Sequence, residues 1–355
     1  MKDTVKYVVE RILFILLTAF IILSLTYILL QCLPLEPSGN DAVQQFTFWN
    51  HQVELGFYYE VSEQDYFQMT IEAREKLKTV VLDGRNYYYG AYPILHRYGQ
   101  WLLNVVTRWD WGTSTSSIGF NQDVVSIIMT RLPYSMRLNI ISMLISIPLG
   151  IGLGILAALK KNTWVDSLIS TVIMIFISVP SFVLISFLLL WFRKIPGFPS
   201  SWPSDSQAAA DPLLAIKGYI IPVMSLCFGS ICSFARYTRA ELTEVMGSEF
   251  LLLARTKGLT RGQSVVRHAL RNSMVPIVPM IIGEFISILS GSMVLEQIYA
   301  IPGIGSLFVD GITNRDYSVV MVDMAIYTTI GLFATLIIDL SYGIVDPRIR
   351  MGSRK

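Results

Sequence analysis

Charged residues are scarce in this chain. Only 15% of its 355 residues are charged and 53% are hydrophobic, with a mean hydropathy of +0.52, whereas a typical soluble domain is about 25% charged. The three cysteines, Cys32, Cys227 and Cys232, lie in or beside apolar runs and are interpreted as small hydrophobic residues rather than disulfide partners. The composition therefore indicates a membrane protein, and the net charge of +2 gives no reason to expect nucleic acid as a partner.

Motifs of catalysis and cofactor binding are also missing. The chain has no phosphate-binding GxxxxGK[S/T] loop, so any ATP would be bound by another chain. It has no GxSxG or HExxH motif, and His51, His96 and His268 lie far apart in the sequence. We therefore expect a protein that is not an enzyme and that holds no metal or cofactor of its own.

Six apolar runs are long enough to span a bilayer, which takes about 20 residues. They cover residues 12–30, 138–159, 168–192, 219–235, 274–295 and 319–345. The first run lacks a small-residue cleavage site and is interpreted as a retained anchor. The predicted fold class is an all-α polytopic membrane protein with six transmembrane helices.

The basic residues predict the orientation in the membrane. An even number of spans places both termini on one side, and the segments of that side hold 16 of the 28 Lys and Arg residues. Three lie near the N-terminus, two at 160–161, seven between 236 and 271, and four from 348 onward. Because cytoplasmic loops are enriched in Lys and Arg, we expect a multi-pass protein of the cell membrane with both termini in the cytoplasm.

These assignments give a domain organisation. Residues 1–33 are the cytoplasmic N-terminus and first helix, and residues 34–130 form an extracytoplasmic loop. Residues 131–350 form a five-helix core that includes a cytoplasmic loop at 236–273, and residues 351–355 form a tail.

The long loop at 34–130 is expected to contain a small folded insert that combines helix and strand, rather than a loose loop. The pattern at 52–61 predicts a strand, and Ser62 with Asp65 predicts the start of a helix that runs toward residue 82. A group of tyrosines is interpreted as core or interfacial belt rather than a docking patch: Tyr87, Tyr88, Tyr89 and Tyr92.

Polar residues interrupt the apolar runs most clearly at 249–276. A first helix is expected at 248–257, ended by Gly258 in a left-handed conformation with Leu259 after it. Thr260 and Gln263 have the spacing of a capping box that starts a second helix. A pair of short helices with apolar faces, outside the membrane-spanning runs, predicts a surface that docks against a partner.

The second helix has its own apolar face. It is made of Val265, Val266, Ala269 and Leu270. For these residues, packing against the chain's own spans is favoured over contact with a partner.

Three acidic residues lie inside apolar runs, where a carboxylate is costly and tends to be functional. Glu284, in the fifth run, is expected either to line a path for substrate or to hydrogen-bond between helices. For Asp323 and Asp339, in the sixth run, a structural role is favoured. Three prolines lie in or at the runs with Gly or Ser nearby and suggest helices that bend: Pro148, Pro180 and Pro222.

Several motifs, in order, resemble those of one family. They are WGTS at 111–114, RLP at 131–133, EFLLLARTKGL at 249–259, RHALRN at 267–272 with Pro276, GS at 291–292 with Glu296, PGIG at 302–305, NRDY at 314–317 and DPRIR at 346–350. The chain resembles the inner-membrane permease subunits of binding-protein-dependent ABC importers. More narrowly, it is similar to the first permease of the oligopeptide, dipeptide and nickel branch.

The chain departs from the family pattern in three places. Leu252 stands where the wider family's loop has Glu, and PLEP at 34–37 replaces the expected PGDP. Residues 41–97 have no counterpart that the motifs identify.

The resemblance implies partners and a role. The family pairs such a chain with a second homologous permease, two cytoplasmic ATPases that bind ATP and Mg²⁺, and an extracytoplasmic substrate-binding protein, with peptides as the expected cargo. It implies that the loop at 249–276 couples to an ATPase, and the expected contact residues are Phe250, Leu251, Ala254, Arg255, Lys257, Gly258 and Leu259.

Two other functions were weighed against this one. A stand-alone ion-coupled secondary transporter or channel would explain the spans and Glu284 but not the cytoplasmic helix pair. A membrane-anchored receptor would leave five spans without a purpose.

Overall fold

The structure is a computed structural model that describes residues 2–35, 41–288 and 291–345. The chain divides into two compact units. The first unit comprises residues 1–15, 131–306 and 330–355, and the second comprises residues 16–130 and 307–329. The motif at 346–350 and the tail lie outside the described residues.

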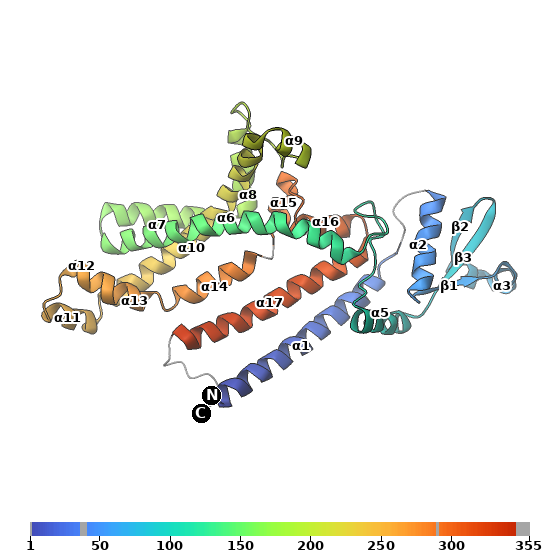
Figure 1. Cartoon of the computed structure of the whole chain (residues 1–355), viewed down its shortest axis with the longest axis horizontal. Helices are drawn as coiled ribbons and strands as arrows, with labels where there is room; N and C mark the ends of the chain where they lie inside the picture. Colours follow the sequence, from blue (N-terminus) through green and yellow to red (C-terminus); the bar gives the residue numbers. More distant parts are fainter. Residues whose placement is uncertain (1, 36–40, 289–290, 346–355) are drawn as a thin grey trace. The chain divides into compact units, whose positions relative to one another are not determined.

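The chain is mostly helical, with one small sheet (Figure 1). In chain order the elements are α1 (Lys2–Gln31), α2 (Ala42–Glu54), β1 (Tyr58–Val61), α3 (Glu63–Gln68), α4 (Ile71–Glu75), β2 (Lys78–Leu82), β3 (Arg85–Ala91), α5 (Ile94–Arg108), α6 (Val124–Leu159), α7 (Trp164–Ile177), α8 (Ser181–Phe192), α9 (Asp205–Ala210), α10 (Pro212–Met246), α11 (Glu249–Thr256), α12 (Arg261–Ser264), the π-helix η1 (Val265–Ala269), α13 (Leu270–Ser273), α14 (Ile277–Ser287), α15 (Met293–Tyr299), α16 (Ile304–Thr313) and α17 (Tyr317–Val345).

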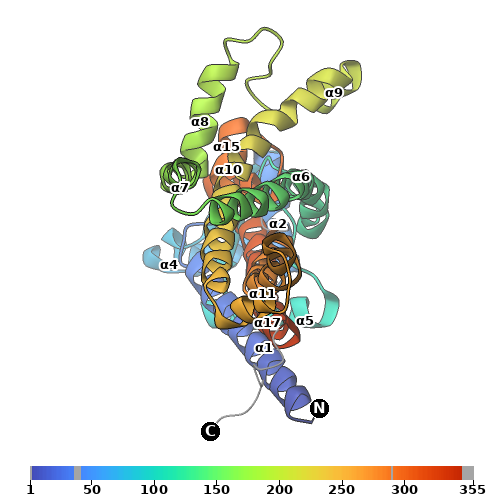
Figure 2. The same ribbon diagram turned by 90° about the vertical axis from the view of Figure 1, so that its left-hand side faces the viewer.

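Four described helices, α1, α6, α10 and α17, are long and apolar enough to cross a membrane, and the number reaches six if two bent pairs each count as one span. The first pair, α7 and α8, bends by 100°, and Figure 2 shows α8 turning away from α7. Pro180, the N-cap of α8, has an extended backbone at this bend. Since proline lacks an N–H and disfavours the helical conformation before it, the bend expected from Pro180 is confirmed. α6 and α10, in contrast, continue as single helices through Pro148 and Pro222.

The expectation of one helix over residues 274–295 is wrong. α14 ends at Ser287 and α15 starts at Met293. Gly291, between them, has a left-handed φ of +60°, and a Cβ there would lie 2.8 Å from a carboxylate oxygen of Glu296. The mean hydropathy of the run is high enough for a span, so the small and polar residues around Gly291 were not interpreted as a break.

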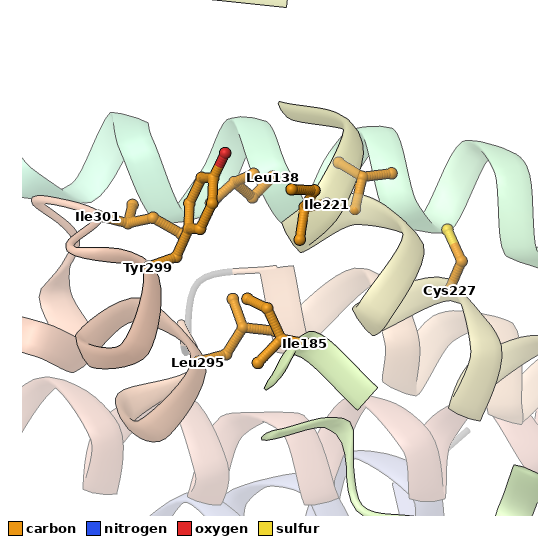
Figure 3. Packing of buried hydrophobic residues seen from close by; sticks show 8 residues of the cluster. Leu138, Ile185, Ile221, Cys227, Leu295, Tyr299 and Ile301 are labelled. Carbon is orange, nitrogen blue, oxygen red and sulfur yellow. The ribbon is translucent and has the colours of Figure 1, made fainter. Parts of the chain in front are cut away.

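The core of the first unit joins four helices (Figure 3). Leu138 of α6 and Ile185 of α8 pack with residues of α10 and α15. Cys227 belongs to this cluster and Cys232 is also buried, while Cys32 is exposed and all three are free thiols. The interpretation of cysteine as a hydrophobic residue is therefore confirmed for the two buried ones.

The second unit contains a three-stranded antiparallel sheet with the order β1-β3-β2. One face of the sheet is covered by α2, which packs Phe48 and Trp49 against Tyr58, Val80 and Tyr89. Tyr89 is fully buried and donates a hydrogen bond to Asn50. Aromatic side chains thus give this small region a core of its own.

Two expectations for this region need correction. The strand expected at 52–61 begins only at Tyr58, because α2 continues to Glu54 and buries its aromatic face. The helix capped by Ser62 ends at Gln68 rather than running toward residue 82, where the structure has β2. Tyr88 and Tyr89 belong to the core, as one of the alternatives predicted.

Candidate coupling loop and polar cavity

The residues between α10 and α14 form two short helical segments at one end of α10 (Figure 1). α11 ends at Thr256, and Gly258 has a left-handed φ of +89°. The N–H of Leu259 reaches back to the carbonyl of Ala254 at 3.4 Å, which satisfies an orphan carbonyl of the helix end. The left-handed glycine expected at this position is confirmed.

The second segment begins with a reciprocal cap. Thr260 accepts from the N–H of Gln263 at 3.3 Å, and the side chain of Gln263 accepts from the N–H of Thr260 at 3.2 Å. Both bonds of the predicted capping box are present. The connection between the two segments is therefore fixed by local interactions: the left-handed Gly258 that ends the first and the Thr260–Gln263 cap that starts the second.

A buried cluster fixes this loop to the ends of α6 and α10. It consists of Ala158, Leu242, Leu251, Val265 and Ala269. The expectation that the second segment packs on the chain's own spans is confirmed for Val265 and Ala269.

Leu251 was expected to contact a partner, and its burial contradicts this expectation. Its side chain is only 1% exposed, because α11 turns this face onto Ala158 and Leu242. Leu251 therefore anchors α11 and is not available to a partner.

The opposite face of α11 is open and apolar. Leu252 is 64% exposed and Phe250 is 43% exposed, and Leu253 is exposed as well. Arg255, Lys257 and Gly258 are exposed beside them, and Ala254 and Leu259 are half-buried. The structure thus leaves six of the seven predicted residues at least partly accessible, and adds Leu252 and Leu253.

Val266 also differs from its expected role. The segment from Val265 to Ala269 is π-helical, with more residues per turn than an α-helix. Val265 and Ala269 are buried in the cluster with Leu242 and Leu251, while Val266 is exposed. The change of helix type was not visible in the sequence, since an α-helical projection places all these residues on one face.

A polar cavity of about 210 Å³ lies within the first unit. It is lined from α6, α10, α14 and the residues after α14: Asn139, Ser142, Leu226, Ser230, Glu284, Ser287, Gly291 and Ser292. Glu284 is half-buried and accepts a hydrogen bond from Ser230 at 2.6 Å. The hydrogen bond to α10 agrees with the structural alternative for Glu284, while its role in a path for substrate stays a prediction.

A second carboxylate, Glu296 on α15, is almost fully buried. Its two oxygens accept bonds from the hydroxyl of Ser135 at 2.7 Å and from the N–H groups of Ser292 and Ser306 at 3.1 and 3.0 Å. Burial raises the pKa of this carboxyl, while the hydrogen bonds from Ser135 and from backbone N–H groups act to lower it. Glu296 therefore joins α6, α15 and the start of α16.

In the second unit, Asp316 joins two motifs that lie far apart in the sequence through hydrogen bonds to its carboxylate. One of its oxygens accepts from the hydroxyls of Ser114 and Ser116 at 2.6 and 2.8 Å, and from the N–H groups of Thr115 and Ser116 at 3.1 and 3.2 Å. The WGTS and NRDY motifs thus meet at one buried carboxylate.

The other two acidic residues of the apolar runs, Asp323 and Asp339, lie on α17. Asp339 pairs with Arg11 at 2.9 Å, which supports the role favoured from the sequence, and Asp323 is fully buried in α17. A bidentate pair was not expected from the sequence: Arg239 of α10 donates to both oxygens of Asp166 on α7, at 2.5 and 2.9 Å. Only the fold brings these two residues together.

The apolar helices, the polar cavity between them and the helical loop at one end of α10 define a multi-pass membrane protein of the transporter class. Residues 150–351 match the family described as binding-protein-dependent transport system inner membrane component, and the chain belongs to this family. The family comprises the permease subunits of ABC importers, which are not ATPases themselves and work with ATPase and substrate-binding partners. The ion-coupled transporter is therefore not supported.

Curated relatives match over most of the chain. The dipeptide transport system permease protein DppB of Lactococcus lactis subsp. cremoris is 32% identical over 349 residues, which cover 98% of this chain and 100% of the relative. The oligopeptide transport system permease protein OppB of Escherichia coli K12 is 33% identical over 262 residues, 73% of this chain and 81% of the relative. The match with the L. lactis protein therefore runs across residues 41–97.

Among solved structures, the chain is similar to an inward-facing MetNI methionine ABC transporter. The TM-score is 0.46 at 17% identity, covering 61% of this chain and 97% of that chain. This likeness is too distant to inform the fold or the function.

Proposed function

We propose that the chain is a permease subunit of an importer whose cargo is peptides. The observation that carries this proposal is the match over 98% of the chain to a dipeptide permease, supported by the match to an oligopeptide permease. The chain forms half of the translocation path and pairs with a second homologous permease. Two cytoplasmic ATPases, which bind ATP and Mg²⁺, and an extracytoplasmic binding protein complete the importer.

Both termini and the loop at 236–273 lie in the cytoplasm. The clustering of Lys and Arg in these segments supports this orientation. The sheet region at 58–91 then lies outside the cell, in the loop that the binding protein approaches. A protease added to intact cells or spheroplasts tests the arrangement by cutting the sheet region and leaving the loop intact.

The face of α11 opposite Leu251 binds an ATPase. It presents exposed leucines and Phe250 to water, and the charges of Arg255 and Lys257 fix the position of α11 on the ATPase. The contact residues are Phe250, Leu252, Leu253, Ala254, Arg255, Lys257, Gly258 and Leu259. Leu251 transmits movement because it packs on the ends of α6 and α10.

The cavity at Glu284 is part of the path. Its polar lining comes from three helices that belong to candidate membrane spans. A hydrated cargo crosses at the lowest desolvation cost where the lining is polar.

Reconstitution tests the function. The chain is placed in liposomes with the second permease, the ATPases and the binding protein, and uptake of labelled di- to pentapeptides is measured. We expect uptake that requires ATP hydrolysis and each partner. Uptake driven by an ion gradient without the ATPases would contradict the proposal.

A further inference from the structure

Glu284 is the one charged residue in the lining of the polar cavity. The other described lining residues are uncharged: Asn139, Ser142, Leu226, Ser230, Ser287, Gly291 and Ser292. No ion pair among the described residues includes Glu284. The cavity therefore carries a negative charge for which the part of the chain that the structure describes supplies no cation.

The hydrogen bonds leave one side of this carboxylate open. Ser230 donates to Oε1 at 2.6 Å, and Oε2 accepts no bond from another described residue. Asn139 donates instead to the carbonyl of Ile288 at 2.9 Å, which leaves its side-chain oxygen as a further acceptor in the lining. The cavity thus offers oxygen acceptors together with a negative charge, which suits a group that brings both donors and a positive charge.

We propose that Glu284 binds the ammonium group of the peptide as it crosses the membrane, an inference that rests on the proposed function. An ammonium group supplies three donors and no acceptor, which matches an acceptor-lined cavity with one carboxylate. The group is either the α-ammonium of the peptide or the side chain of a lysine within it.

The strength of such a site fits transport. A cargo must bind well enough to enter the path and weakly enough to leave it. One carboxylate with a free oxygen forms a single charge-assisted bond, whereas several converging charges would hold the cargo too firmly. Ser230 orients the carboxylate from α10, so relative movement of α10 and α14 changes the site.

Uptake by the complete reconstituted transporter tests the proposal. Three peptides of equal length are compared: one with a free N-terminus and neutral side chains, its N-acetylated form, and an N-acetylated form that contains lysine. Capture of each by the binding protein is measured first, and uptake is expressed relative to capture. The variants are Glu284→Gln and Glu284→Asp, with Glu10→Gln as a control that neutralises an exposed carboxylate of α1.

We expect Glu284→Gln to lower the preference for the free over the acetylated peptide by about tenfold, as the loss of one charge-assisted bond predicts. Glu284→Asp restores part of the preference and Glu10→Gln leaves it unchanged. If the lysine-containing acetylated peptide behaves like the free peptide, the side-chain ammonium is accepted as well. If it behaves like the neutral acetylated peptide, the site is specific for the α-ammonium.

A second measurement detects the contact with Glu284 directly instead of through a transport rate. A membrane-permeant carbodiimide is added during turnover, and peptide adducts on the permease are mapped by mass spectrometry. We expect coupling of the peptide amine to Glu284, and no adduct at Glu284 with the neutral acetylated peptide, which has no amine.

Equal preferences in wild type and Glu284→Gln, or no adduct at Glu284, would overturn the ammonium site while leaving the importer intact. Absence of ATP-dependent uptake for every peptide would instead contradict the proposed function.

Discussion

Two carboxylates twelve residues apart have opposite surroundings. Glu296 is buried and accepts bonds from one hydroxyl and several backbone N–H groups. Glu284 is half-buried in a cavity and accepts one described hydrogen bond, from Ser230. A carboxylate whose acceptor positions are filled by the fold holds the fold together, and one that keeps an open position is available to a ligand.

Neighbouring leucines show the same contrast among apolar groups. Leu251 is buried in the anchor of α11, while Leu252 is exposed. The first stabilises the loop and the second is left for a partner. The following predictions test whether Glu296 and Leu251 stabilise the fold while Glu284 and Leu252 are available to a ligand or a partner.

The largest loss of stability is expected for Glu296→Ala. It leaves the hydroxyl of Ser135 and the N–H groups of Ser292 and Ser306 without their acceptor inside the protein. The cost is about 3–5 kcal/mol, measured as a lower unfolding midpoint in detergent. An unchanged midpoint would mean that the hydrogen bonds of Glu296 to Ser135, Ser292 and Ser306 do not stabilise the fold.

Asp316→Ala is expected to cost about 3 kcal/mol, because it removes the acceptor shared by Ser114, Thr115 and Ser116. The same unfolding experiment measures the loss. Limited proteolysis should also show earlier cleavage near residues 111–116, and a wild-type cleavage pattern would contradict the role of Asp316 as the link between the two motifs.

Leu251→Ala is expected to cost about 2–5 kcal/mol through the cavity it leaves. Leu252→Ala, one residue away, should change the stability by no more than about 0.5 kcal/mol, since its side chain is exposed. Equal effects of the two substitutions would mean that α11 does not present the face described here.

Glu284→Gln should have only a small effect on folding, about 1 kcal/mol or less, because the amide oxygen still accepts from Ser230. Normal expression and an unchanged unfolding midpoint are expected, together with altered uptake. A severe loss of stability would assign Glu284 to the structural group with Glu296.

Local signals in the sequence predicted local structure well. The left-handed Gly258, the Thr260–Gln263 cap and the Pro180 bend each depend on residues close together in the chain, and each is present. The family was also predicted from motifs in order, and the match over residues 150–351 confirms it.

Hydropathy could not distinguish the environments that apolar residues meet. In a membrane protein a leucine contacts lipid, core or a partner with the same favourable burial. Leu251 was therefore expected to contact a partner and Leu252 was not, which is the reverse of their exposure. The break at Gly291 was missed for a similar reason, since hydropathy averaged over residues 274–295 does not show where a helix ends. The partners of Asp166, Glu284 and Asp316 required the fold, because they lie 54 to 202 residues away.

The docking face of α11 is the central claim, and site-specific photo-crosslinking tests it most directly. A photoreactive phenylalanine analogue replaces Phe250, which is 43% exposed on α11, or Phe187, which is 58% exposed on α8. In membranes that contain the assembled importer, we predict a crosslink to the ATPase from position 250 and none from position 187. A crosslink from neither position, with normal ATP-dependent uptake in both variants, would contradict the claim.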